Sequence, residues 1–322
     1  MLSQTIYVAA KLGVADLVCD GARPVDELAA ATGVHARSLY RFLRALAAVA
    51  VFVEDDQGRF GLGPLGHHLR SDTPGSLRSY AIHANEESYR AWGEALYSVR
   101  TGQPAFDHVF GTGFYEYLKG HVEADEVWNR AMSETEWSFA VQMGMVAAYN
   151  WTDLQTVVDV GGSHGTLIAA LLGTCAHLRA VVFDLPHVVE GARAELIKAG
   201  VVERCQLVGG DFFSEVPSGA DAYILSRVLF NWDDDDATTI LRNCRDAMRA
   251  GGRVLVMEPV IPPGNEADLA KLIDLNVFVI CGGRTRNEAE LAALFERAGL
   301  SLTQRIPTPS AWNIIEGRAL RS

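Results

Sequence analysis

Three polar clusters in the second half of the chain each follow a run of apolar residues that is typical of a buried strand. The first is the turn 159–165, whose glycines let the backbone approach a ligand closely. The second is Asp184, a carboxylate able to accept hydrogen bonds from both hydroxyls of a ribose. The third pairs Asp211 with Phe212, an acceptor beside an aromatic face that suits an adenine. Their order predicts a nucleoside cofactor, and because the glycines do not follow the pattern G-x-G-x-x-G, one without a pyrophosphate fits better than NAD.

Apolar segments typical of strands alternate with segments of helical pattern, and these elements would position the clusters. The apolar segments typical of strands are 156–160, 180–184, 206–208, 222–225 and 253–257, with 301–305 and 312–316 closing the chain as a hairpin. Strands that are apolar throughout are buried on both faces, as in a parallel sheet. We therefore expect an open α/β sheet over residues 149–322, with the ligand at the carboxyl ends of its strands.

The first 148 residues have a helical pattern instead. One helical segment begins near residue 25 and stops near Gly33, and a second covers residues 35–46. Short strands at 51–54 and 59–62 follow, and this order is the outline of a winged helix. Residues 1–80 carry as many basic as acidic side chains, so this module lacks the charge that DNA binding requires. We predict a winged-helix dimerisation domain over residues 1–90, a homodimer, and aromatic helices over residues 91–148 that line an apolar pocket for a flat ligand.

Composition disfavours several other classes of protein. The net charge of −12 is spread over both halves of the chain, which argues against nucleic acid as a partner. Five cysteines without a CxxC pattern predict neither a disulfide framework nor a zinc site. The run Asp233–Asp236 is more typical of a helix cap than of a metal site. No apolar run reaches the roughly 18 residues of a membrane span and no leader peptide is apparent, so we expect a cytoplasmic protein without membrane contact.

Further motifs along the chain accompany the three clusters. They are Pro104–Phe106, Ala131–Met132, Asn231–Asp234, Leu241–Cys244, Glu258–Pro259 and Gly282–Arg284. With these motifs the whole chain resembles the class I S-adenosylmethionine-dependent methyltransferases, and more closely the bacterial natural-product branch of the caffeate-type O-methyltransferase family. The resemblance implies an α/β, Rossmann-like domain of seven strands, an N-terminal, mostly helical winged-helix domain that dimerises, and S-adenosyl-L-methionine as the cofactor.

The resemblance also implies roles for individual residues. The cofactor would be bound by Gly161, Ser163, Gly165, Asp184, Leu185, Asp211, Phe212, Ser226 and Trp232. Within this set, the turn would contact the amino-acid end of the cofactor, Asp184 the ribose, and Asp211 with Phe212 the adenine. The acceptor would bind among Met132, Trp137, Asn276, Val277 and Cys281. Ser163 stands where the family usually has a glycine.

Catalysis is where the sequence departs from the family. A histidine that removes the acceptor's hydroxyl proton usually precedes the Asp/Asn-Trp pair, and Phe230 occupies that position, followed by Asn231 and Trp232. Of the two glutamates that orient this histidine, Glu258 is present and the other is replaced by Thr285. Phenylalanine cannot move a proton. We therefore expect catalysis by positioning, with Glu258 and Asn231 as the polar groups at the acceptor, or a base from elsewhere in the chain such as His83.

The leading hypothesis is methyl transfer from S-adenosylmethionine to a hydroxyl of an aromatic, polyketide-like secondary metabolite. The sequence is similar to family members that act on anthracycline-like polyketides, in which an apolar residue replaces the histidine and some members keep the cofactor for other chemistry. Three alternatives stay open. They are methylation of carbon or nitrogen; hydroxylation, decarboxylation or cyclisation with the cofactor retained; and, least favoured, a winged-helix DNA-binding or sensor protein.

Overall fold

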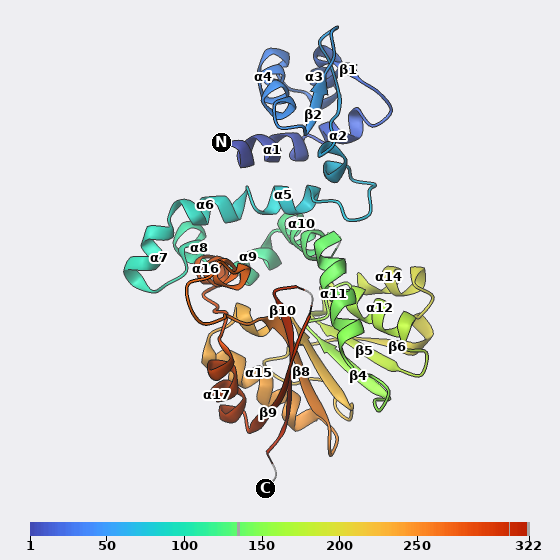
Figure 1. The fold of residues 1–322 in the computed structure, drawn as a ribbon, viewed down its shortest axis with the longest axis vertical. Helices are drawn as coiled ribbons and strands as arrows, with labels where there is room; N and C mark the ends of the chain where they lie inside the picture. The colour runs from blue at the N-terminus through green and yellow to red at the C-terminus, as the bar shows by residue number, and fades with distance from the viewer. Residues whose placement is uncertain (134–135, 309, 321–322) are drawn as a thin grey trace. The chain divides into compact units, whose positions relative to one another are not determined.

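A computed structural model of the chain describes residues 1–133, 136–308 and 310–320, and of residues 134–139 it describes no side chain. By packing, the chain forms two compact units (Figure 1). The first comprises Met1–Gly93 and Tyr115–Phe139, and the second comprises Glu94–Phe114 and Ala140–Ser322. The domain boundaries at residues 90 and 148 stay a prediction, since the segment between them is shared by the two units.

The first unit is mostly helical. Its elements are α1 (Leu2–Lys11), α2 (Val14–Leu17), β1 (Arg23–Pro24), α3 (Val25–Thr32), α4 (Ala36–Ala47), β2 (Phe52–Glu54), β3 (Arg59–Leu62), η1 (Gly66–Leu69), α5 (Arg78–His83), α6 (Glu87–Gly93) and α10 (Val122–Ser133). The strands form an antiparallel sheet in the order β1-β3-β2. Leu39, Leu43 and Leu46 recur at helical spacing and are buried on one face of α4. The helix–helix–hairpin outline expected from the sequence is confirmed.

The second unit is built on a seven-stranded sheet in the order β6-β5-β4-β7-β8-β10-β9. Its strands are β4 (Thr156–Val160), β5 (Arg179–Asp184), β6 (Cys205–Gly209), β7 (Ala222–Ser226), β8 (Arg253–Pro259), β9 (Leu300–Pro307) and β10 (Trp312–Ala319). Strands β4 to β8 pair in parallel, and β10 pairs antiparallel with both β8 and β9. This is the expected Rossmann-like sheet, and β9 with β10 is the expected closing hairpin.

Helices cover both faces of this sheet (Figure 1). The second unit contains the helices α7 (Ala95–Thr101), α8 (Ala105–Phe110), α12 (Thr166–Thr174), α13 (Pro186–Val189), α14 (Ala192–Lys198), α15 (Asp234–Ala247), α16 (Leu269–Cys281) and α17 (Glu288–Arg297). Two more helices, α9 (Phe114–Gly120) and α11 (Glu136–Ala148), run from one unit into the other. Val157 of β4 packs in one apolar layer with side chains of α11, α12 and α14. The next residue, Val158, packs in the opposite layer with α15 and α17. None of the described helices has the length and apolar character of a membrane span.

The order of the strands reverses beside β4. The chain passes from β4 to β5 and β6 on one side and then to β7 on the other. Open α/β sheets bind ligands at such a switch point, outside the carboxyl ends of the strands. The turn 161–165 follows β4, Asp184 is the last residue of β5, and the segment after Ser226 follows β7. The topology therefore brings all three to this edge.

Candidate active site

The turn between β4 and α12 depends on its glycines. Gly161 and Gly165 have φ angles of 73° and 71°, in the left-handed region that favours glycine. A Cβ atom on Gly161 would lie 2.8 Å from Cγ2 of Val228, so the position has no room for a side chain. Ser163 adopts a φ of 47° without being glycine. The turn therefore holds a compact shape that exposes backbone at the switch point.

Asp184 anchors this turn. Its Oδ2 accepts a hydrogen bond from the Ser163 N–H at 2.8 Å, and its Oδ1 accepts one from the Leu185 N–H at 2.7 Å. Burial raises the pKa of Asp184, and the two N–H donors oppose that rise. Each carboxylate oxygen keeps further acceptor capacity, which two ribose hydroxyls could use. The structure thus brings together three of the predicted cofactor residues and gives Asp184 a second task, that of shaping the turn.

Two charged residues that sequence reasoning did not single out, Asp159 and Arg227, interact beside the turn. Asp159 of β4 is buried, and burial, followed by the charge of Asp184, raises its pKa to about 7, while the charge of Arg227 opposes the rise. Arg227 follows β7 with a φ of 61°. Burial lowers the Arg227 pKa to about 10, and the charge of Asp159 opposes that shift. The available signal was an ionisable residue inside, or directly after, an otherwise apolar strand.

Aromatic rings gather where the adenine is expected. The Phe212 and Trp232 ring centroids are 6.0 Å apart, edge to face, and those of Phe213 and Trp232 are 4.8 Å apart. Asn243 of α15 donates to the backbone oxygens of Phe212 and Phe213 at 2.8 and 3.0 Å, which fixes the segment after β6. Asp211 is exposed and accepts the Phe213 N–H at 2.9 Å. The structure thus brings together Phe212 and Trp232, which were both predicted to bind the cofactor, and adds Phe213 and Asn243, which sequence reasoning did not single out.

Phe230 lies in the turn η3 (Leu229–Asn231), and its ring belongs to the hydrophobic core. The ring centroid is 5.8 Å from that of Trp312. The Phe230 N–H donates to Oε2 of Glu258 at 3.0 Å, and Oε1 of Glu258 has no hydrogen-bond partner among the described residues. Burial raises the Glu258 pKa to about 7, against the charge of Arg286 and the Phe230 N–H. A carboxyl group with its pKa raised to about 7 thus adjoins Phe230, the position at which the resemblance predicts a replaced histidine.

The predicted acceptor residues are spread over both units. Cys281 of α16 lies with its Sγ 4.0 Å from Oδ1 of Asn231 and 3.3 Å from the Val277 oxygen. Val277 is buried in the core, while Asn276 is exposed. Met132 lies on α10 in the first unit, and the side chain of Trp137 is outside the described residues. Within the second unit, the structure therefore brings Cys281 close to Asn231 and Val277.

His83, the alternative base, is buried in the first unit. Its ring centroid is 4.7 Å from that of Trp128, and its Nε2 is 3.3 Å from Oγ of Ser88. Burial lowers the His83 pKa to about 4. A base with so low a pKa accepts protons poorly near neutrality.

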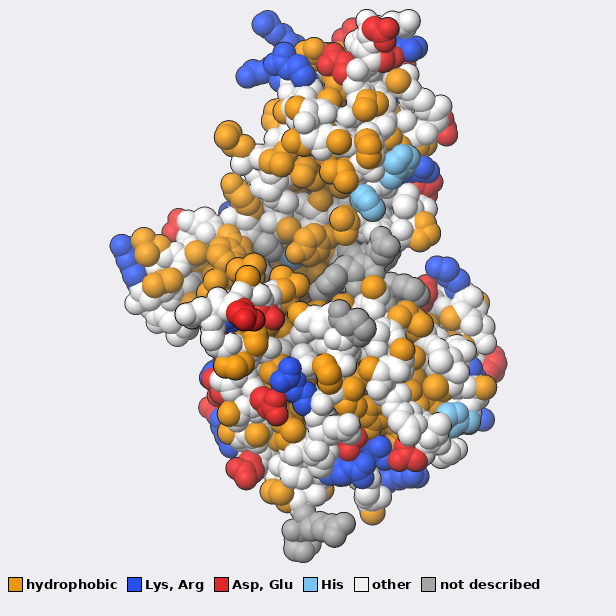
Figure 2. Space-filling model, viewed as in Figure 1, with side chains coloured by type: hydrophobic (Ala, Val, Ile, Leu, Met, Phe, Trp, Pro, Cys, Tyr) orange, Lys and Arg blue, Asp and Glu red, His pale blue; other side chains and the backbone are white. Residues whose placement is uncertain are grey.

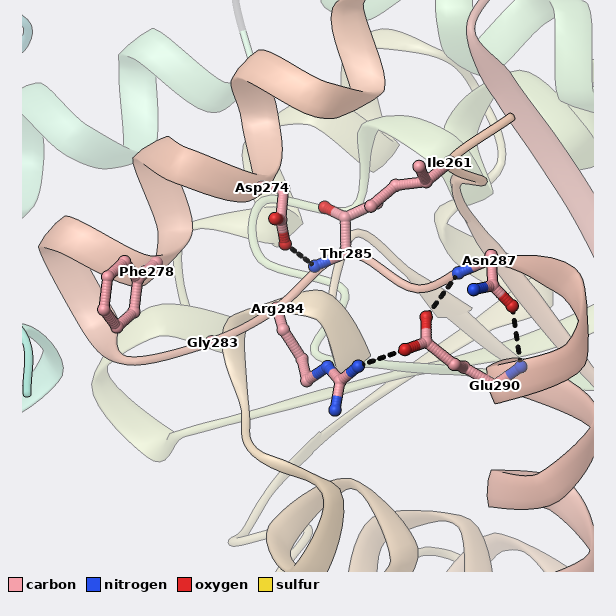
Figure 3. Close-up of a pocket in the computed structure, with 8 residues that line it drawn as sticks. All are labelled: Ile261, Asp274, Phe278, Gly283, Arg284, Thr285, Asn287 and Glu290. Atoms are coloured by element: carbon pink, nitrogen blue, oxygen red, sulfur yellow. Dashed lines mark hydrogen bonds and ion pairs between the residues drawn. The ribbon is translucent and has the colours of Figure 1, made fainter. Parts of the chain in front are cut away.

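The two remaining sequence features have structural roles. Asp233 caps α15 by accepting the N–H groups of Asp235 and Asp236 at 3.0 and 2.9 Å, which confirms the predicted helix cap. Thr285 is buried, its N–H donates to Oδ1 of Asp274 at 2.8 Å, and it helps to line a pocket in the second unit (Figure 3). The residues that line this pocket are Ile261, Asp274, Phe278, Gly283, Arg284, Thr285, Asn287 and Glu290.

Two family models match the chain. An O-methyltransferase domain matches residues 92–301, and an O-methyltransferase dimerisation domain matches residues 1–72. The chain belongs to this O-methyltransferase family. The winged-helix module of the first unit is thus the family's dimerisation domain, which supports a homodimer.

Relatives cover nearly the whole chain. It is 45% identical to the phenazine O-methyltransferase PhzM of Lysobacter antibioticus over 99% of this chain and 93% of that protein. It is 34% identical to the phenazine-1-carboxylate N-methyltransferase of Pseudomonas aeruginosa over 97% of this chain and 92% of that protein. The solved structure of the O-methyltransferase NcsB1 from neocarzinostatin biosynthesis, in complex with S-adenosylmethionine and 2-hydroxy-5-methyl naphthoic acid, has a TM-score of 0.86 at 38% identity, covering 99% of this chain and 96% of that one. The protein is an S-adenosylmethionine-dependent methyltransferase.

The switch point fits this cofactor. Oδ1 of Asp159 and Oγ of Ser226 are buried and have no hydrogen-bond partner among the described residues, so a polar ligand would satisfy them. A Cβ atom at Gly161 would collide with Val228 and lie 3.8 Å from Cε1 of Phe212, so only glycine fits the turn beside that ring. Asp184 offers acceptors for hydroxyls, and the rings of Phe212 and Trp232 offer apolar faces for a base.

Proposed function

We propose that the protein transfers the methyl group of S-adenosylmethionine to a hydroxyl of a polycyclic aromatic natural product, and that it does so by positioning, without a histidine base. The proposal rests on Phe230, which the resemblance places at the base position: its apolar ring packs against Trp312 and its N–H binds Glu258. The relatives supply the acceptor class, because PhzM is named for a phenazine and NcsB1 binds a naphthoic acid.

The cofactor supplies an electrophilic methyl group on a sulfonium. Asp184 and the turn 161–165 hold the ribose and the amino-acid end, and Phe212 with Trp232 encloses the adenine. Asn231 orients the acceptor oxygen, which attacks the methyl carbon as the bond from carbon to sulfur breaks. Holding two reactants in line can supply about 7–11 kcal/mol of a barrier in favourable cases, so the geometry alone gives a large acceleration. The hydroxyl proton leaves to solvent, and S-adenosylhomocysteine is released.

Methylation of nitrogen is the second candidate. The Pseudomonas aeruginosa relative is named as an N-methyltransferase, and a neutral ring nitrogen or arylamine carries a free lone pair. Such an acceptor needs no base before it attacks. A neutral amine is therefore as compatible with an apolar residue at position 230 as an acidic phenol is. The two candidates differ in the acceptor atom and share the cofactor site.

A product assay tests the proposal. The purified protein is incubated with S-adenosylmethionine and a panel of hydroxylated phenazines and naphthoates, together with the amines of the same ring systems. We expect a product heavier by one methyl in place of one hydrogen, with one S-adenosylhomocysteine released for each product. Products from the amines alone would favour the second candidate. An oxidised or decarboxylated product without release of S-adenosylhomocysteine would refute both.

We also expect a homodimer held by the first unit. Large apolar side chains are exposed along α5 and α6, among them Leu77, Tyr80 and Tyr89, and Figure 2 shows hydrophobic side chains gathered over this unit. An isologous partner is the commonest way to cover such a surface. Light scattering at micromolar concentration should give twice the chain mass of 35.0 kDa.

Matched variants locate the interface. Tyr80 is 48% exposed in the first unit, and Ile197 is 58% exposed on α14 of the second unit. Tyr80→Asp should shift the protein toward the monomer, whereas Ile197→Asp should leave the dimer intact. A wild-type protein that scatters as a monomer would contradict the prediction.

A further inference from the structure

Arg286 is a fully buried cation at the rear of the candidate site. Its side chain has no exposure to solvent, although arginine rarely lies inside a protein without a specific partner. The backbone of Arg286 pairs with the segment after β8, where the Ile261 N–H donates to the Arg286 oxygen at 3.1 Å. Taking such a charge out of water is costly unless hydrogen bonds satisfy it. Its partners therefore indicate what the buried charge does.

The guanidinium binds both ends of the turn that carries Phe230 and Asn231. Nη1 donates to the Leu229 oxygen at 3.3 Å, and Nη2 donates to the Trp232 oxygen at 3.1 Å. Nε donates to Oδ1 of Asp234 at 2.9 Å, and Nη2 lies 2.8 Å from the same oxygen. The planar fork of arginine can bind a carboxylate and two carbonyls in one fixed geometry, which the ammonium of lysine cannot.

The turn itself is short. η3 spans Leu229–Asn231, and its N-cap residue Val228 makes no side-chain cap. The N–H groups of Asn231 and Trp232 donate to oxygens three residues earlier, and the Phe230 N–H donates to Glu258. The positions of Asn231 and Trp232 depend on the shape of this turn. The Trp232 ring contacts Phe212 and Phe213, and Asn231 lies beside Cys281. A turn of three residues has little stability of its own, so an external clamp decides where these side chains point.

We propose that Arg286 is the positioning residue of this turn: by binding the oxygens of Leu229 and Trp232 it places Trp232 at the adenine and Asn231 at the acceptor. The placement of Trp232 at the adenine can be tested by cofactor binding alone, without knowledge of the acceptor. The effect on the acceptor rests on the proposed function. Measuring the two separately distinguishes failure of this inference from failure of that function.

Arg284 provides a matched control. It lies two residues before Arg286 and also pairs with Asp234, with Nη1 3.2 Å from Oδ2, but its side chain is 42% exposed. Its side chain also binds Glu290, in the pocket of Figure 3, and makes no hydrogen bond to the turn among the described residues. Its backbone oxygen accepts from Nη1 of Arg286 at 3.3 Å, a contact that Arg284→Lys leaves in place. The two arginines thus share a carboxylate and differ in whether they contact the turn.

The test compares Arg286→Lys with Arg284→Lys in the full-length protein. Calorimetry measures the affinity for S-adenosylhomocysteine, and initial rates on an acceptor found by the product assay give kcat and KM separately. Because lysine keeps the charge and loses the fork, Arg286→Lys should weaken cofactor binding about tenfold and lower kcat at saturation by about tenfold to a hundredfold. Arg284→Lys should stay within about twofold of the wild type in both quantities.

Hydrogen exchange covers the case in which Arg286→Lys does not fold. Asp234→Asn weakens the clamp from the solvent side while leaving Arg286 in place. The amides of residues 230–232 should then exchange faster in Asp234→Asn than in Arg284→Lys, and cofactor affinity should fall with them. Unchanged affinity and kcat in Arg286→Lys, equal losses in both lysine variants, or unchanged exchange at residues 230–232 in Asp234→Asn would each overturn the proposal.

Discussion

Replacing Asp184 with alanine is expected to weaken the binding of S-adenosylmethionine by about 3 kcal/mol, a factor of roughly 100 in Kd. One part of this loss is the charged acceptor for the ribose hydroxyls. The other part arises because Asp184 also binds the N–H groups of Ser163 and Leu185, at 2.8 and 2.7 Å. Removing the carboxylate therefore removes two hydrogen bonds that hold the turn and also the acceptor for the ribose hydroxyls. Calorimetry with S-adenosylhomocysteine measures the effect without turnover.

Two variants separate these contributions. Asp184→Asn keeps one oxygen for a backbone N–H and should lose less affinity than the alanine variant. Asp211→Ala removes an exposed carboxylate that accepts a single N–H, from Phe213, and should cost about tenfold or less because water competes at that position. If Asp184→Ala bound the cofactor as tightly as the wild type, the assignment of the pocket would be wrong.

The outline of the cofactor site could be predicted because its parts are local in the sequence. The turn after β4, the acid after β5 and the acid–aromatic pair after β6 each follow an apolar strand directly. Parallel topology then brings successive strand ends to one edge of the sheet. Ser163 and Phe212 therefore lie beside predicted neighbours, namely Asp184 and Trp232.

Partners that are distant along the chain could not be predicted from residue patterns. The resemblance alone implied that Glu258 adjoins position 230, 28 residues away, and nothing indicated that Arg286 meets the Leu229 oxygen across 57 residues. Neither contact has a spacing rule, since each depends on how β8 and the segment before α17 pack against the turn. The sequence likewise marks Glu258 as an acid without showing its burial, and it is this burial that raises the pKa to about 7.

For a hydroxyl acceptor, the rate of turnover is expected to follow the ionisation of the acceptor itself. Phe230 cannot take a proton, and burial holds the His83 pKa at about 4. Below the pKa of the acceptor, turnover should rise about tenfold for each pH unit, because only the phenolate reacts. Phenols conjugated to a carbonyl or quinone ionise well below the value of about 10 that is usual for tyrosine, so such acceptors would react near neutrality. Electron-withdrawing substituents on the acceptor lower its pKa. They should move the rising limb of the profile of turnover rate against pH to lower pH by the same amount.

Glu258 is the residue that could contradict this expectation. Its pKa of about 7 is suited to a general base, and its Oε1 has no hydrogen-bond partner among the described residues. If Glu258 removed the proton, turnover would show a limb near pH 7 at the same place for every acceptor, and Glu258→Gln would abolish it. If catalysis is by positioning, the turnover rate of Glu258→Gln should still rise with pH, along a limb that shifts with the pKa of the acceptor. His83→Ala serves as the parallel control for a base in the first unit.

The comparison is valid only when chemistry limits the rate. Product release can hide a limb, so single-turnover rates with enzyme in excess are the proper measurement. An arylamine acceptor gives a further check, because its neutral form already carries the attacking lone pair. Turnover of such an amine should stay level from neutral pH upward while that of the matching phenol rises. A phenol limb that stays fixed across acceptors would show that the protein supplies a base, and positioning alone would then be an insufficient account of this site.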